Sequence, residues 1–140
     1  MPNMGTKITT IIGFIILGVA MSLTVNFMLE LTYLNIGHKN VNEIPTFYFL
    51  VISWLLLPYL VMGVNLGIHA KRNPKMVGLD CLFIILLSAA GLYLLISNIY
   101  YSKDAQAPIA MIFFPIYQLA GFLILNVLVS RKRRNIRGDN

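Results

Sequence analysis

Residues 8–34 read ITTIIGFIILGVAMSLTVNFMLELTYL, an apolar run that no charged residue interrupts before Glu30. A helix needs about 20 apolar residues to cross the hydrocarbon core of a bilayer, so this run is long enough to span one. Helical spacing places Ser22, Asn26 and Glu30 on one face. A carboxylate in hydrocarbon is costly unless it is neutralised, paired or in contact with water. We therefore expect the other helices to shelter this polar face.

Three further apolar runs occupy residues 47–68, 77–99 and 109–129. In the whole chain, 58% of the residues are hydrophobic and 11% are charged, a composition typical of membrane proteins. The connections are too short to hold a folded unit outside the membrane. The chain is therefore predicted to be all-α, with a single transmembrane domain over residues 1–140. We expect a polytopic bundle of four transmembrane helices in up-down-up-down order.

The formal net charge is +6, and the placement of the basic residues indicates topology. They gather between the second and third runs and again in a tail at residues 130–140, and the positive-inside rule makes both segments cytoplasmic. With four spans, both termini are then cytoplasmic, and we expect a multi-pass protein of the cell (inner) membrane. The residues predicted to anchor this topology and to contact anionic lipid head groups are Lys71, Arg72, Lys75, Arg131, Lys132, Arg133 and Arg134.

Polar residues also gather at the expected cytoplasmic ends of the helices. Asn65 and His69 share one face of the second run, Asp80 lies in the first turn of the third, and Asn126 lies near the inner end of the fourth. We expect Asp80 to complement the positive helix N-terminus and to pair with one of the three cations between the second and third runs. Asn65 and Asn126 are expected to form hydrogen bonds between helices.

The middle of the helices carries small residues and one amide. Small residues let helix backbones approach closely in a membrane. The glycines predicted to serve this packing are Gly63, Gly67, Gly91 and Gly121. Gln118 lies near the middle of the fourth run, and we expect it to complete the polar membrane face formed by Ser22, Asn26 and Glu30.

The chain shows no motif for catalysis, a cofactor or a metal. It has one cysteine, Cys81, which excludes an intramolecular disulfide, and no motif frames this thiol as a nucleophile. The two histidines, His38 and His69, fall on opposite sides of the membrane in the predicted topology, so one chain cannot bring them to a common metal. We expect no enzymatic activity, no cofactor, no metal and no nucleic-acid partner.

Two interpretations of function follow. The leading one is a small integral membrane protein that acts by lateral helix contacts with another membrane protein, as an accessory subunit, an assembly factor or an immunity-type inhibitor. The alternative is a homo-oligomeric transporter or channel for a small solute or ion, in which Glu30 lines the pathway. A membrane enzyme that acts on lipid through Asp80 or His69 is a third interpretation.

Overall fold

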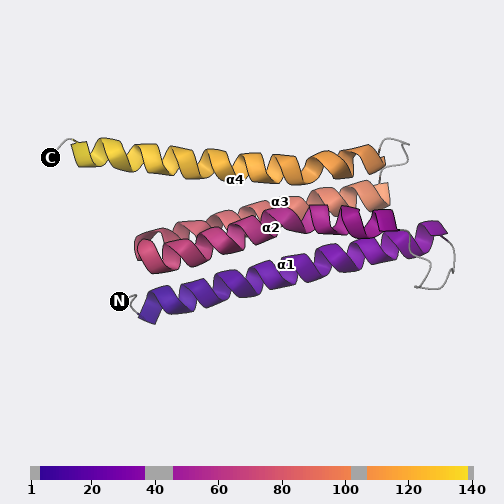
Figure 1. Cartoon of the computed structure of the whole chain (residues 1–140), viewed down its shortest axis with the longest axis horizontal. Coiled ribbons are helices and arrows are strands. Elements are labelled where there is room, and N and C mark those ends of the chain that lie inside the picture. Colours follow the sequence, from indigo (N-terminus) through magenta and orange to yellow (C-terminus); the bar gives the residue numbers. More distant parts are fainter. Residues whose placement is uncertain (1–3, 37–45, 102–106, 139–140) are drawn as a thin grey trace.

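The structure of the chain, a computed structural model, describes residues 4–36, 46–101 and 107–138, and side-chain surroundings for residues 4–30, 46, 49–98 and 113–128. These segments are almost entirely helical, and no strand is present among them (Figure 1). The helices are α1 (Met4–Ile36), α2 (Thr46–Arg72), the 3₁₀ turn η2 (Pro74–Met76), α3 (Val77–Tyr101) and α4 (Ala107–Gly138).

The long helices have the length and composition that a membrane span needs. Met4–Glu30, Phe49–Arg72 and Pro74–Asn98 are each apolar enough and long enough to cross a bilayer. The described apolar part of α4 is shorter, Phe113–Leu128. A helix satisfies its backbone hydrogen bonds internally, which hydrocarbon requires of any spanning segment. The prediction of an all-helical chain is confirmed, and these helices indicate an integral membrane protein.

The helices lie side by side. α1 packs against α2 and α3, and α4 packs against the same two helices, which also contact each other. Figure 1 accordingly shows α2 and α3 between α1 and α4, with the start of α1 and the end of α4 at the same end of the molecule. The link from α2 to η2 is tight, because the Asn73 amide donates to the His69 carbonyl and the Met76 amide donates to the Asn73 carbonyl.

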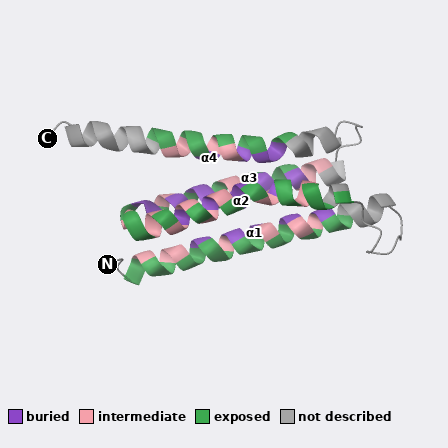
Figure 2. Cartoon of the chain, in the orientation of Figure 1, coloured by how far each residue is buried: buried purple, intermediate pink, exposed green. Residues whose placement is uncertain are grey.

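Each described helix has buried residues on one side and exposed residues on the other (Figure 2). On α1, the side chains of Leu17, Ala20, Thr24 and Met28 are buried, three or four residues apart, as expected for a face that packs on a neighbour. Large apolar side chains such as Ile15 lie exposed on the other faces. The described helices are therefore apolar both inside and outside, which suits a lipid surround.

Close approach of α1 to its neighbours depends on a glycine that the sequence analysis did not single out. A Cβ atom at Gly13 would lie 2.7 Å from Leu66 Cδ2 and 2.9 Å from Cys81 Sγ. These distances are too short for any real side chain, so Gly13 lets α1 sit directly on α2 and α3.

The four glycines predicted for packing each lie against a residue of another helix. A Cβ atom at Gly63 would be 3.5 Å from Leu17 Cδ1, and one at Gly67 would be 3.9 Å from Phe14 Cζ. The Gly-x-x-x-Gly pair of α2 therefore faces α1 of the same chain. At Gly91 a Cβ atom would overlap the Gln118 amide, and at Gly121 it would be 3.4 Å from Leu87 Cδ2.

Candidate functional site

The polar face of α1, defined as Ser22, Asn26 and Glu30, points away from the rest of the chain. All three residues are exposed. A helix turns by about 100° per residue, so this face lies roughly half a turn from the stripe that packs on α2 and α3. We expected the other helices to shelter these side chains, and this expectation is wrong. The sequence showed which residues share a face but not which face meets a neighbour.

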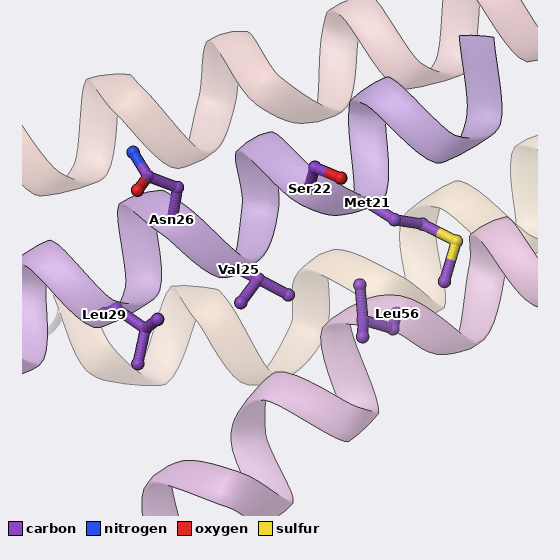
Figure 3. A pocket seen from close by; sticks show the side chains of 6 residues that line it. All are labelled: Met21, Ser22, Val25, Asn26, Leu29 and Leu56. Carbon is purple, nitrogen blue, oxygen red and sulfur yellow. The ribbon is translucent and has the colours of Figure 1, made fainter. Parts of the chain in front are cut away.

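An open groove runs beside this polar face, between α1 and α2. Its volume is about 410 Å³, and Figure 3 shows the side chains that line it. Ser22 and Asn26 project from one side of α1 in this view, and Val25 and Leu29 project from the other. The lining residues are Met21, Ser22, Val25, Asn26, Leu29 and, from α2, Leu56.

A second groove of about 380 Å³ shares Met21 with the first and continues toward the start of α1. It is lined by apolar side chains, by Tyr59 and by two glycines, Gly18 of α1 and Gly63 of α2. No atom lies within 4 Å of the position that a Cβ atom of Gly18 would take. We call the two grooves together the α1–α2 groove. Gly18, Ser22 and Asn26 follow one another at four-residue spacing along its edge.

The polar atoms of this face are open to new partners. Neither the Ser22 hydroxyl nor the Asn26 amide makes a hydrogen bond with another described residue. An amide in hydrocarbon without partners is costly, and interhelical hydrogen bonds are the usual way to satisfy it. The arrangement can therefore accept hydrogen bonds from, or donate them to, a helix that lies in the groove.

A second polar site lies where α2 ends and α3 begins. The Asp80 carboxylate is 1% exposed, and its Oδ2 lies 2.6 Å from His69 Nδ1. The Asn65 amide donates to Asp80 Oδ1 over 3.2 Å. An ionised carboxylate can only accept, so His69 Nδ1 is the donor of this hydrogen bond when Asp80 is ionised. Three of the predicted inner-end residues thus form one hydrogen-bonded cluster between α2 and α3.

The prediction that Asp80 pairs with a nearby cation is wrong. We expected Lys71, Arg72 or Lys75, but these side chains are exposed. The carboxylate is buried against α2, where Asn65 and His69 lie one turn apart on the face that meets α3. A flexible cation held at the water interface would have to leave water to reach it.

The fourth predicted member of the cluster, Asn126, does not join two helices. Its side-chain amide donates to the Phe122 carbonyl over 3.0 Å, within α4. This bond to the preceding turn satisfies the amide within α4, so the prediction that Asn126 forms a hydrogen bond between helices is wrong.

The Cys81 thiol has its own partner, because it donates to the Thr9 carbonyl of α1 over 3.2 Å. It makes no pair with the His69 imidazole.

Gln118 lies in the interior, apart from the α1 polar face. It is 5% exposed, and its Nε2 donates to the Leu87 carbonyl of α3 over 3.0 Å. The predicted polar membrane face therefore divides into an outer part on α1 and an inner part at Gln118. Sequence analysis gave no polar role to Thr24 or Tyr59, whose hydroxyls approach each other at 3.4 Å near this inner part. Spacing puts Thr24 on the same face as Leu17 and Ala20, but no sequence signal shows that this face is the buried one, because both sides of α1 are apolar.

Some predicted residues lie outside this description. The side chains of the basic tail, Arg131, Lys132, Arg133 and Arg134, and the whole of His38 are not among the described residues. Within the described residues, no three His, Cys, Asp or Glu side chains come together as metal ligands would. Comparison with protein-family models, curated proteins and solved structures gives no significant match.

Proposed function

We propose that this chain is an integral membrane protein that acts by lateral helix contact with another membrane protein, as an accessory subunit, an assembly factor or an immunity-type inhibitor. One observation carries the proposal: Ser22 and Asn26 are exposed on a membrane-spanning stretch of α1, at the edge of an open groove. A lipid chain offers these atoms no hydrogen bond, whereas a second helix does.

The same face suits close helix packing. Gly18 and Ser22 form a pair of small residues four positions apart, and the space in front of Gly18 is open. Such pairs favour right-handed helix crossings at about −40°, in which backbones approach closely. Asn26, one turn further along, would add an interhelical hydrogen bond worth about 1 kcal/mol. A partner helix would therefore lie across α1 in the α1–α2 groove.

For orientation, we infer an up-down-up-down bundle with both termini cytoplasmic in the cell (inner) membrane. The exposed cations Lys7, Lys71, Arg72 and Lys75 support it, since they lie at the ends of α1 and α2 and in η2. The common position of the start of α1 and the end of α4 supports it too (Figure 1). These cations would contact anionic lipid head groups on the inner leaflet.

Co-purification from the native membrane tests the lateral contact. A tagged copy would be extracted in nanodiscs, and the proteins that accompany it would be quantified by mass analysis. We expect the wild type to retain a larger membrane protein in fixed ratio and Asn26→Leu to lose about tenfold of it, since one bond and its packing are removed. Asn98→Leu on α3 is the matched control, because Asn98 bonds within its own helix to the Leu94 carbonyl. Equal recovery with both variants would refute the proposal.

The alternative is a homo-oligomeric transporter or channel. It is favoured by the exposure of Glu30 on the same face as Ser22 and Asn26, because copies that meet through α1 would line a pathway with all three. This alternative predicts that the purified protein moves a solute or ion across liposomes and that Glu30→Gln abolishes the flux while the fold is retained. Unchanged flux in Glu30→Gln would exclude the role of Glu30.

A further inference from the structure

Glu30 ends the polar face of α1 at a level that lies inside the helix bundle. Two residues before it, Met28 is buried in an apolar cluster to which the other helices contribute Leu55, Leu95 and Phe114. These three lie nine residues after the start of α2, six before the end of α3 and seven after the start of α4. At about 1.5 Å per residue, the cluster lies about 9–14 Å inside the end of the bundle at which α2 and α4 begin (Figure 1). We call this end the distal end.

Apolar surface continues beyond Glu30 toward the distal end. Glu30 lies about 3 Å past the cluster along α1, so it stays about 6–10 Å inside that end. Phe49 and Leu50 lie further still toward the start of α2, and they are 56% and 64% exposed. The helix α1 also continues beyond Glu30, and residues 31–36 carry no charge. An exposed carboxylate at this depth therefore faces lipid chains rather than the water beyond the helix ends.

No residue of the described segments neutralises this carboxylate. Glu30 is exposed and makes no ion pair or hydrogen bond with another described residue. The cations whose side chains are described, Lys7, Lys71, Arg72 and Lys75, lie at the opposite end of the helices, and Lys7 precedes Glu30 by about 35 Å of α1. A carboxylate in hydrocarbon is costly unless it is neutralised, paired or in contact with water. A partner has to come from beyond these segments.

We propose that the helix bound by the polar face of α1 carries a lysine or arginine that pairs with Glu30. This inference rests on the proposed function and names the chemistry of the partner. Ser22 and Asn26 require only a polar group opposite them, whereas Glu30, one turn further along the same face, requires a cation. Opposite charges within membrane spans pair with one another because each is costly alone. The partner is therefore a membrane protein with a basic residue inside its span, at the level of Glu30.

A second copy of this chain fits the face less well. Two parallel copies that meet through α1 bring their Glu30 carboxylates to the same level, where like charges repel. The cations with described side chains lie at the opposite end of each copy. A charged pair also selects between partners, because a helix with an acid or an apolar residue at this level leaves Glu30 unpaired. The chemistry favours a basic helix of a different protein over self-association.

Synthetic membrane helices test the charge directly. The full chain, labelled at its C-terminus with a donor fluorophore, is reconstituted in phosphatidylcholine vesicles with acceptor-labelled helices of leucine and alanine that carry a Gly-x-x-x-Gly pair and one asparagine. The helices differ at a single position, one turn after the asparagine and about five residues from one end, which holds Lys, Leu or Glu. We expect the Lys helix to bind at least about 30-fold more tightly than the Leu helix, and the Glu helix to bind most weakly.

Exchange of the charge supplies the matched control. Glu30→Gln keeps the size and shape of the side chain and should reduce binding of the Lys helix to that of the Leu helix. Glu30→Lys should reverse the order, so that the Glu helix binds most tightly. Because Glu30 is exposed, neither variant removes a contact among the described residues. Equal binding of the Lys and Leu helices to the wild type, or a preference for the Lys helix that survives in Glu30→Gln, overturns the inference.

Asn26→Leu separates a failure of this inference from a failure of the proposed function. If the polar face binds helices, Asn26→Leu weakens binding of the Lys, Leu and Glu helices by a similar factor. That result, together with equal wild-type affinities for the Lys and Leu helices, contradicts the cationic partner alone. No effect of Asn26→Leu on any helix contradicts contact at the polar face itself. Absence of binding by the Lys helix also overturns the inference, and co-purification from the native membrane then decides the lateral contact separately.

Discussion

At the scale of single residues, Asp80 is the described acid that is buried and hydrogen-bonded to other side chains. Its side chain is 1% exposed, whereas its partner His69 is 22% exposed. The carboxylate receives hydrogen bonds from both His69 and Asn65. A buried carboxyl group is tolerated when it is hydrogen-bonded, and this cluster provides two such bonds. The cluster therefore fixes the end of α2 to the start of α3.

Asp80→Ala leaves the His69 and Asn65 donors without their acceptor. We expect the free energy of unfolding to fall by about 3 kcal/mol, the usual cost of breaking a buried pair. The measurement is detergent-induced unfolding followed by circular dichroism. Lys71→Ala, at an exposed position next to the cluster, should change it by less than about 0.5 kcal/mol. Similar losses in both variants would show that the Asp80 cluster has no special part in stability.

At the scale of the helix, α1 is attached through its Gly13 side and leaves its polar face open. Gly13 meets Leu66 and Cys81, and the Cys81 thiol donates to the Thr9 carbonyl. Cys81, the one cysteine of the chain, is thus buried where α1 covers α3. Its chemical accessibility reports whether α1 is in place.

Gly13→Leu should push α1 away from α2 and α3, because even a Cβ atom has no room there. We expect Cys81 to react with a maleimide at least about tenfold faster than in the wild type, since local opening exposes the thiol. Gly18→Leu is the control, because its side chain enters open space and should leave the rate unchanged. A slow reaction in Gly13→Leu would mean that α1 packs differently.

The sequence predicted where the helices lie along the chain better than which side of each helix is buried. Apolar length identified each helix, and the four-residue spacing correctly grouped Ser22, Asn26 and Glu30. It could not orient the group, because the exposed and buried sides of α1 are both apolar, as Ile15 and Leu17 show. In a soluble protein, polarity would have marked the outer side. The pairing of Asp80 with His69, and the Gly91 space for Gln118, depend on contacts between helices that spacing along one helix does not contain.

At the scale of the whole molecule, the exposed cations among the described residues gather at one end of the helices. The described cations at this end, Lys7, Lys71, Arg72 and Lys75, are exposed, whereas Asp80 is buried and paired with His69. Exposed positive charge at one end favours retention of that end in the cytoplasm.

Reporter fusions test this orientation. We expect a reporter at either terminus to show a cytoplasmic location, and a reporter inserted between residues 37 and 45 to show an external one. Replacing Lys71, Arg72 and Lys75 together by Gln should reduce the fraction of molecules in this orientation. An external C-terminus in the wild type would overturn the topology.

The proposed function depends on contact between the polar face of α1 and another membrane protein. Photo-crosslinking in the native membrane tests it most directly, with a light-activated amino acid placed at Ser22 and, as the control, at Leu86, which is 56% exposed on α3. We predict a crosslinked product with a different membrane protein from position 22 and none from position 86. Crosslinks from position 22 only to lipid would contradict the claim, and crosslinks only to a second copy of the chain would favour the homo-oligomer instead.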